Sequence, residues 1–164
     1  MTTTYDCIAT TTLGSAQTSV TFSSISGSYT DLVLVIGGTS NGLAGCTLQF
    51  NGDTGSNYSN TVMYGIYTTA GIQNARSTNA TNIGDLGQLD TIGGTVIIQI
   101  QNYSNSTTNK TVLGKGGTTT NGIIMAAVGL WRNTAAITSI VVGIQNAKTF
   151  SSGTVFSLYG IKAE

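Results

Sequence analysis

The chain alternates short apolar runs with polar, glycine-rich segments, and the runs recur at spacings of about 8–12 residues, as in all-β proteins. Residues 19–23 place Val20 and Phe22 at alternate positions, the pattern of a strand with one buried face. Residues 32–36 are apolar without a break, which indicates a strand covered on both faces, at the centre of a sandwich or beneath a neighbouring subunit. The pattern predicts an all-β fold, an antiparallel, jelly-roll-like β-sandwich of roughly nine to eleven short strands.

Two stretches between the predicted strands are harder to assign. Residues 68–82 hold few large apolar side chains, so we expect a long surface excursion with at most a short strand. Ile83, Leu86 and Leu89 recur at every third position, which suits a strand or one or two helical turns; two glycines and the short length favour the strand. The remaining predicted strands are residues 5–13, 19–23, 31–37, 46–50, 60–67, 95–102, 110–114, 123–131, 137–144 and 154–161.

No composition shift marks a domain boundary. Residues 1–164 are therefore expected to form a single domain, with residues 1–4 as a flexible or docking N-terminus. Residues 123–131 would also admit a helix, but Gly122 and Gly129 favour a strand there.

Charged side chains are scarce, and their scarcity disfavours partners that are recognised mainly through charge. They make up 7% of the chain, with six basic and six acidic residues, against about a quarter in a typical domain. Nothing in this balance steers the protein to nucleic acid or to an anionic membrane. We also expect no secretion signal and no membrane span, and hence folding in a cytoplasm. A surface of Thr, Ser, Asn and Gly suits a protein packed in an assembly or one that contacts sugars.

The residues that usually carry catalysis are missing or out of context. The chain has no His, the commonest general base and metal ligand near neutral pH. Asp85 and Asp90 are the nearest thing to a glycosidase pair, and turn positions explain them better. Cys7 and Cys46 are expected to be small core residues rather than a disulfide. We therefore expect no enzyme activity and no cofactor.

The polar loop after residue 50 is the most distinctive local feature. It opens with Asn51-Gly52, a strong signal for a tight hairpin turn. Asn51, Asp53, Gly55 and Asn57 fall at alternate positions, like the oxygen ligands of a calcium loop. However, Gly55 offers no ligand and Val62 stands where a closing Glu is needed, so no metal is predicted.

A contact surface is the alternative interpretation of this loop and of a second one near residue 103. Tyrosines beside amide and carboxylate side chains are typical of sugar-binding surfaces, although a tyrosine at a strand end can instead cap the core. The predicted contact residues, toward a neighbouring protein or a glycan, are Asn51, Asp53, Asn57, Tyr58 and Tyr103.

Six motifs occur in a fixed order along nearly the whole chain: residues 8–15 (IATTTLGS), 22–25 (FSSI), 29–34 (YTDLVL), 50–59 (FNGDTGSNYS), 129–137 (GLWRNTAAI) and 156–162 (FSLYGIK). As a set they resemble a group of small virion structural proteins of tailed bacteriophages, especially phages of aquatic cyanobacteria and other marine bacteria. The resemblance implies a protein of the virion surface, assembled in the host cytoplasm, without a catalytic motif. Members of the group are free-standing proteins or the distal part of longer tail-fibre chains.

Two functions remain open. The first is a capsid decoration or cement protein, a homo-oligomer that bridges head capsomers and contacts the capsid protein. The short chain, the lack of a tail-attachment segment before Tyr5, the low charge and the apolar run 32–36 favour it. The second is a tail-fibre or receptor-binding module that contacts host-surface glycans, favoured by the Tyr- and Asn-rich loops and by the relatives fused to fibres. A depolymerase is the least favoured.

Overall fold

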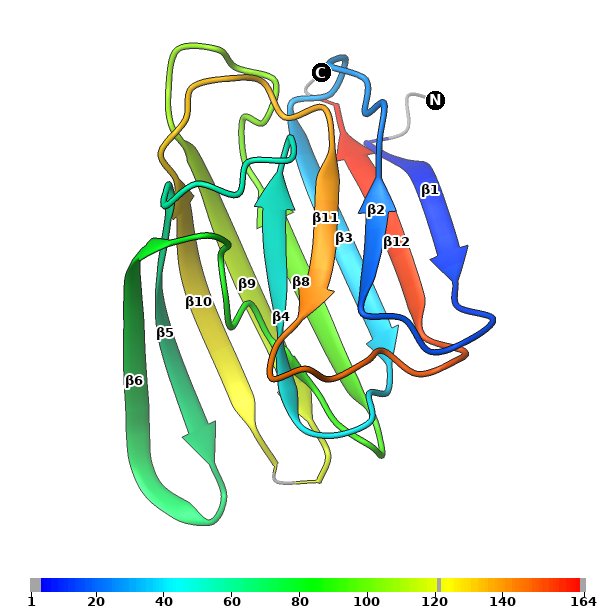
Figure 1. Cartoon of the computed structure of the whole chain (residues 1–164), viewed down its shortest axis with the longest axis vertical. Coiled ribbons are helices and arrows are strands. Elements are labelled where there is room, and N and C mark those ends of the chain that lie inside the picture. Colours follow the sequence, from blue (N-terminus) through cyan, green and yellow to red (C-terminus); the bar gives the residue numbers. More distant parts are fainter. Residues whose placement is uncertain (1–3, 121, 163–164) are drawn as a thin grey trace.

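The computed structural model describes residues 4–120 and 122–162, and this part of the chain forms two antiparallel β-sheets packed face to face (Figure 1). The larger sheet runs, in spatial order, β1 (Tyr5–Thr12), β12 (Val155–Ile161), β3 (Asp31–Gly38), β8 (Gly94–Ile100), β9 (Lys110–Thr118), β10 (Ile124–Trp131), β5 (Tyr58–Ile66) and β6 (Thr69–Ala80). The smaller sheet runs β2 (Ser19–Phe22), β11 (Ile140–Ile144), β4 (Ala44–Phe50) and β7 (Gln88–Leu89).

The expected all-β, antiparallel, jelly-roll-like sandwich is confirmed. The chain crosses repeatedly between the sheets, because β2, β4 and β11 lie in the smaller sheet and the strand after each lies in the larger one. The described residues form twelve strands, slightly more than expected. The additional strand, β6, lacks the apolar alternation that reveals the others in the sequence, and β7 covers only two residues of the strand considered near residues 83–89.

The core lies between the two sheets and is built from alternate side chains. In β3, Leu32, Leu34 and Ile36 have no exposed surface and belong to the core cluster. Val33 and Val35 point to the other face, where Val33 is buried and Val35 is half-buried. The apolar run of β3 is thus covered fully on one face and partly on the other, next to the outer surface described below.

Residues 68–82 contain a long strand, and the expectation of a surface excursion is wrong. β6 spans twelve residues and pairs with β5, with register irregularities near both ends. Ten of its residues are exposed and the other two, Gln73 and Ala80, are half-buried. Because β6 buries neither face, nothing selects for apolar alternation, which is the signal that sequence patterns detect.

Residues 82–92 form neither the continuous strand nor the helical turns that were considered. The segment contains only the two-residue strand β7, yet Ile83, Leu86 and Leu89 are fully buried, whereas Ile92 is 70% exposed. It crosses the inner side of β9 and β10 where these strands carry glycine. A Cβ atom on Gly129 would lie 2.4 Å from the side chain of Ile83, and one on Gly114 would lie 2.4 Å from the carbonyl oxygen of Leu86. Glycine therefore lets the crossing segment lie directly on the sheet.

The two cysteines are free and differ in environment. Cys46 is in the core, as expected, and burial raises the pKa of its thiol to about 12. The expectation that Cys7 is a core residue is wrong, because Cys7 lies exposed on β1, at the edge of the larger sheet.

The predicted docking terminus, residues 1–4, falls mostly outside the described residues. Thr4 is exposed, and its carbonyl accepts a hydrogen bond from the backbone N–H of Lys162 at 3.2 Å. No helix in the described chain is long and apolar enough to cross a membrane.

Candidate interaction surface

One carboxylate, that of Asp53, organises the loop between β4 and β5. Its Oδ2 accepts hydrogen bonds from Trp131 Nε1 at 2.7 Å and from the Asn57 amide at 2.9 Å. Its Oδ1 accepts the backbone N–H of Gly55 at 2.9 Å. The hydrogen bonds from Trp131 and Asn57 hold the pKa of Asp53 below its ordinary value. The carboxylate thus ties the loop to the end of β10.

Asn51 links the same loop to the segment before β11. Asn51 and Gly52 both have positive φ, 52° and 68°, as the predicted tight turn requires. The side-chain oxygen of Asn51 accepts the backbone N–H groups of Thr138 and Ser139, at 2.8 and 3.1 Å. Its amide donates to the carbonyl of Ala136 at 2.8 Å. The side chain of Asn51 therefore links the loop after β4 to the segment before β11, although the two lie far apart in the sequence.

Tyr58 and Tyr103 are buried, so their assignment to a contact surface is wrong. Neither ring has exposed surface. The Tyr58 hydroxyl donates to the carbonyl of Asp53 at 2.9 Å, and its ring stacks on Trp131 at a centroid distance of 6.3 Å. The Tyr103 hydroxyl donates to the carbonyl of Ser26. Burial raises the pKa of both hydroxyls. Both rings cap the core, and neither offers a face for stacking on a sugar.

Asp90, one of the two acidic residues considered for catalysis, serves the fold. The Asp90 carboxylate is buried and accepts the backbone N–H groups of Ile92, Gly93 and Thr120 at 2.7–3.0 Å. Burial raises the pKa of Asp90, but these hydrogen bonds outweigh burial and the pKa lies below its ordinary value. Within the described ranges, no three His, Cys, Asp or Glu residues group so that they could hold a metal ion.

A different surface is left open by the fold: the side of the larger sheet turned away from the smaller sheet, here called the outer face. Along β10, Trp131 points to the core, whereas Ile124 and Val128 point outward and are 70% and 43% exposed. Met63 on β5 is 57% exposed, and Leu113 on β9, directly opposite Val128, is 40% exposed. Large apolar side chains therefore lie side by side in water on three neighbouring strands.

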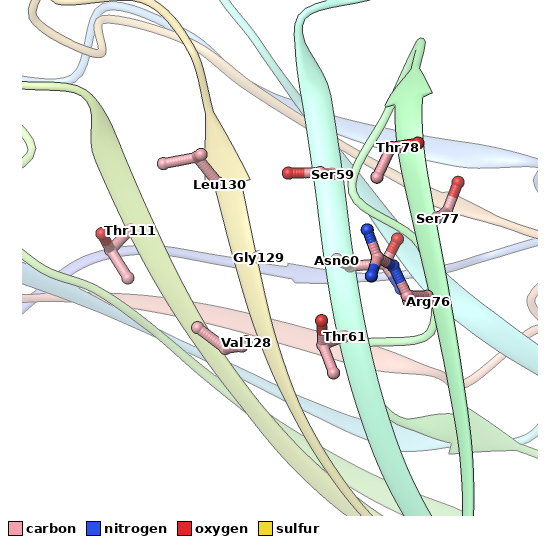
Figure 2. Close-up of a pocket in the computed structure, with 10 residues that line it drawn as sticks. All are labelled: Ser59, Asn60, Thr61, Arg76, Ser77, Thr78, Thr111, Val128, Gly129 and Leu130. Carbon is pink, nitrogen blue, oxygen red and sulfur yellow. The ribbon is translucent and has the colours of Figure 1, made fainter.

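A groove of about 320 Å³ crosses the outer face at β5, β6 and β10 (Figure 2). It is lined by Ser59, Asn60, Thr61, Arg76, Ser77, Thr78, Thr111, Val128, Gly129 and Leu130. Figure 2 shows the guanidinium of Arg76 extending from β6 toward β5, near the hydroxyl of Thr61. Among the described residues, the guanidinium of Arg76 has no hydrogen-bond or ion-pair partner. The groove thus combines a free cation, several hydroxyls and an apolar wall.

A second groove of about 510 Å³ lies beside the first and is more apolar. Ile97, Ile124 and Ala126 line it together with Lys115. The five strands β5, β6, β8, β9 and β10 contain no acidic residue. Their third cation, Lys110, is buried, and its ammonium donates to the carbonyls of Thr108 and Thr134 at 2.7 and 2.9 Å. The outer face over these strands is therefore apolar with two exposed positive charges, Arg76 and Lys115.

Sequence reasoning missed this surface although a signal was present. In residues 123–131 the apolar side chains occupy both sets of alternate positions, as they do in residues 32–36. A strand that buries one face in the core needs only one such set. The second set, which includes Ile124 and Val128, is therefore available for contact with another molecule.

Neither a protein-family model nor a curated protein matches this chain. Among solved structures, it is similar to an exo-inulinase from Aspergillus awamori, at 10% identity and a TM-score of 0.42, over 96% of this chain and 29% of that one. It is similar to the galectin LEC-6 of Caenorhabditis elegans at 8% identity and a TM-score of 0.39, over 90% and 94% of the two chains. It is similar to the alginate lyase Aly36B at 13% identity and a TM-score of 0.31, over 83% and 72%. The chain spans less than a third of the exo-inulinase, and likenesses this distant assign no function.

Proposed function

We propose that the protein is a non-enzymatic structural protein of a bacteriophage virion, a capsid decoration or cement protein that bridges and stabilises head capsomers as a homo-oligomer. The observation that carries the proposal is the outer face, where Met63, Leu113, Ile124 and Val128 each expose 40% or more of their surface. Contiguous apolar side chains of this size on a folded surface mark sites of contact with another protein. In a virion, such a face is covered once the protein has docked.

The charges on the outer face indicate what covers it. Arg76 and Lys115 are exposed there, and the strands around them carry no acidic residue. A second copy placed face to face would bring further cations and no carboxylate from these strands, whereas a partner with carboxylates around an apolar patch would be complementary. The occupant is thus a different protein with an apolar, acidic surface. The resemblance of the sequence motifs to phage virion proteins makes the major capsid protein the natural partner.

The acidic side chains support a non-enzymatic role. Asp53 and Asp90 each accept three or more hydrogen bonds from neighbouring residues, so both carboxylates stabilise the loops around them. With only 7% charged residues, the chain also lacks the charge that keeps most free domains dispersed. Both features suit a protein that functions inside an assembly.

Binding to heads tests the proposal. Ile124→Asp and Val128→Asp each place a carboxylate within the apolar part of the outer face, against a partner that is itself acidic. We expect each to weaken cosedimentation with heads that lack the protein by at least about tenfold, equivalent to roughly 1.4 kcal/mol. Thr21→Asp, on the exposed face of β2 in the smaller sheet, carries the same charge change and should bind like the wild type. Unchanged binding of both outer-face variants, with melting temperatures intact, would refute the proposal.

A second candidate is a receptor-binding module that contacts host-surface glycans. The specific observation in its favour is Arg76, whose guanidinium has no partner within the described part of the chain and faces a groove with the hydroxyls of Ser59, Thr61 and Thr111. A guanidinium is suited to a carboxylate, and hydroxyls are suited to a sugar ring, so the class of ligand would be a glycan that contains uronic acid.

Glycan binding separates the two candidates. The second candidate requires the isolated protein to bind uronic-acid oligosaccharides and to reject neutral ones on a mixed array. Arg76→Ala should then reduce binding at least tenfold (about 1.4 kcal/mol). Lys115→Ala, which removes the same charge from the neighbouring groove, should have a smaller effect. Absence of glycan binding, or equal binding by the Arg76→Ala variant, would remove this candidate.

A further inference from the structure

The strand β6 is an open edge of the larger sheet. In the described chain β5 is its hydrogen-bonded neighbour, and its other side faces solvent (Figure 1). Its twelve residues extend over roughly 40 Å at about 3.3 Å per residue. The backbone N–H and C=O groups along an open edge form a template for another strand, and proteins normally block such edges.

The other three sheet edges of the described chain are short or interrupted. β2 has four residues and β7 has two. β1 has eight, but its register shifts between Cys7 and Ala9, and its Asp6 forms an ion pair with Lys162 at 2.6 Å. Irregular backbone and charge are devices that discourage pairing at an edge. β6 is the longest of the four edges, and its register irregularities lie near its ends, outside the middle of the strand.

The middle of β6 is suited to pairing. Residues 73–77 pair regularly with β5, and the register irregularities fall outside them. β6 contains no proline, and Arg76 is its one charged residue. Most of its side chains are small or uncharged and lie exposed, so a neighbouring strand could approach with little desolvation of charge.

We infer that two copies of the chain pair antiparallel through β6, so that two eight-stranded sheets join edge to edge. Such a pair has a two-fold axis perpendicular to the sheet, and the residue on that axis faces its own copy. Centring the contact on the whole strand puts Asn74 or Ala75 on the axis. Arg76 then lies opposite Ile72 in the first register and opposite Asn74 in the second. In neither register does Arg76 lie opposite its own copy. A second copy can therefore pair with this edge without a contact between like charges, which the outer face does not allow as readily.

The inference rests on the proposed function and refines it. A two-fold axis perpendicular to the sheet keeps both outer faces on the same side of the dimer. Two docking faces then meet one partner surface at once, and the second contact forms at a high effective concentration. Pairing through β6 therefore supplies the homo-oligomer and leaves the outer face free to bind the head.

Lysine substitution on the axis tests the pairing. The wild type should sediment at twice the 16.8 kDa of the chain. The Asn74→Lys/Ala75→Lys variant sets like charges against each other in either register and should sediment as a monomer. Both positions are exposed, so its melting temperature should reflect only the loss of the dimer. Thr21→Lys, with the same kind of charge change on β2, should remain dimeric. A monomeric wild type, or a variant that stays dimeric, would overturn the inference.

Charge-swap mixtures then identify the register. Mixing the Asn74→Lys and Asn74→Glu variants should restore a dimer if Asn74 lies on the axis, and mixing the Ala75→Lys and Ala75→Glu variants should do so if Ala75 does. Failure of both mixtures would contradict pairing at the centre of β6.

The outcome for pairing is separable from the outcome for docking. A monomeric wild type that still cosediments with heads, with sensitivity to Ile124→Asp, would overturn the dimer and leave the proposed function standing. A dimer that dissociates on Asn74→Lys/Ala75→Lys but never binds heads would support the pairing and overturn the proposed function.

Discussion

At the scale of single residues, the side chains that look most like a binding site hold the fold together. Asp53 connects the loop after β4 to Trp131 at the end of β10, and Trp131 in turn packs against the rings of Phe50 and Tyr58. Its indole N–H is buried with the ring, so it depends on this one acceptor. The carboxylate thereby positions the loop and satisfies a donor that has no access to water.

Removing this carboxylate should therefore be costly. Asp53→Ala leaves the indole N–H of Trp131 without an acceptor, and we expect a loss of about 1–3 kcal/mol in the free energy of unfolding. Trp131→Phe combined with Asp53→Ala should cost less than the sum of the two single changes, because the stranded donor is gone. Urea unfolding of the four proteins measures this coupling. Additive losses would show that the hydrogen bond does not contribute as described.

Acid should weaken the fold through Asp53 and Asp90. The pKa of each lies below its ordinary value of 3.8 in the folded protein. The unfolded chain therefore takes up protons first as the pH falls, so the stabilisation is complete above about pH 4 and is lost as the pH drops through the folded pKa values. Melting temperatures from about pH 6 to pH 2 should show this decline. The curve for the Asp53→Asn/Asp90→Asn variant should be flatter, and an identical slope would contradict the assignment.

At the scale of elements, the segment 82–92 shows how close backbone packing replaces regular structure. It lies across β9 and β10 at Gly114 and Gly129, where any side chain would collide with it. The apolar residues of this segment were visible in the sequence, but their positions gave no periodicity that identifies a strand or a helix. Their burial depends on glycines in strands that are distant in the sequence, which local patterns do not reveal.

Gly114→Ala tests this packing. A Cβ atom there would meet the backbone of Leu86, which has no side-chain rotamer to relieve the contact. We expect a loss of about 1–3 kcal/mol in the free energy of unfolding. Gly37→Ala in β3 is the matched control, because its Cβ would find no atom within 4 Å; it should stay within about 0.5 kcal/mol of the wild type. Equal stability of the two variants would contradict the close approach.

Whether a strand buries one face in the core explains whether it could be predicted from the sequence. β2, β3, β8, β10 and β12 each bury one face in the core, and their apolar residues identified them in the sequence. β6 was missed because it buries no face. The tight turn at Asn51 was predicted correctly, but Tyr58 and Tyr103 were assigned to a contact surface although both are buried. A tyrosine that caps the core and one that is free for a ligand look alike in a sequence. Burial and hydrogen-bond partners distinguish them only in three dimensions.

At the scale of the whole molecule, the proposed assembly depends on two features. The outer face carries exposed apolar side chains and the cations Arg76 and Lys115, which suit an acidic partner. The edge strand β6 suits a second copy. Pairing through β6 would place two outer faces on one side of a dimer, and a dimer that binds across neighbouring capsomers would stabilise the head by linkage.

Electron microscopy of the virions to which we propose the chain belongs tests the proposed function most directly. We expect many copies on the head, as β6-paired dimers whose outer faces lie against the capsid, with Ile124 and Val128 buried in the contact. A few copies confined to the tail, or copies on the head with the outer face turned to solvent, would contradict a capsid decoration protein that docks through this surface.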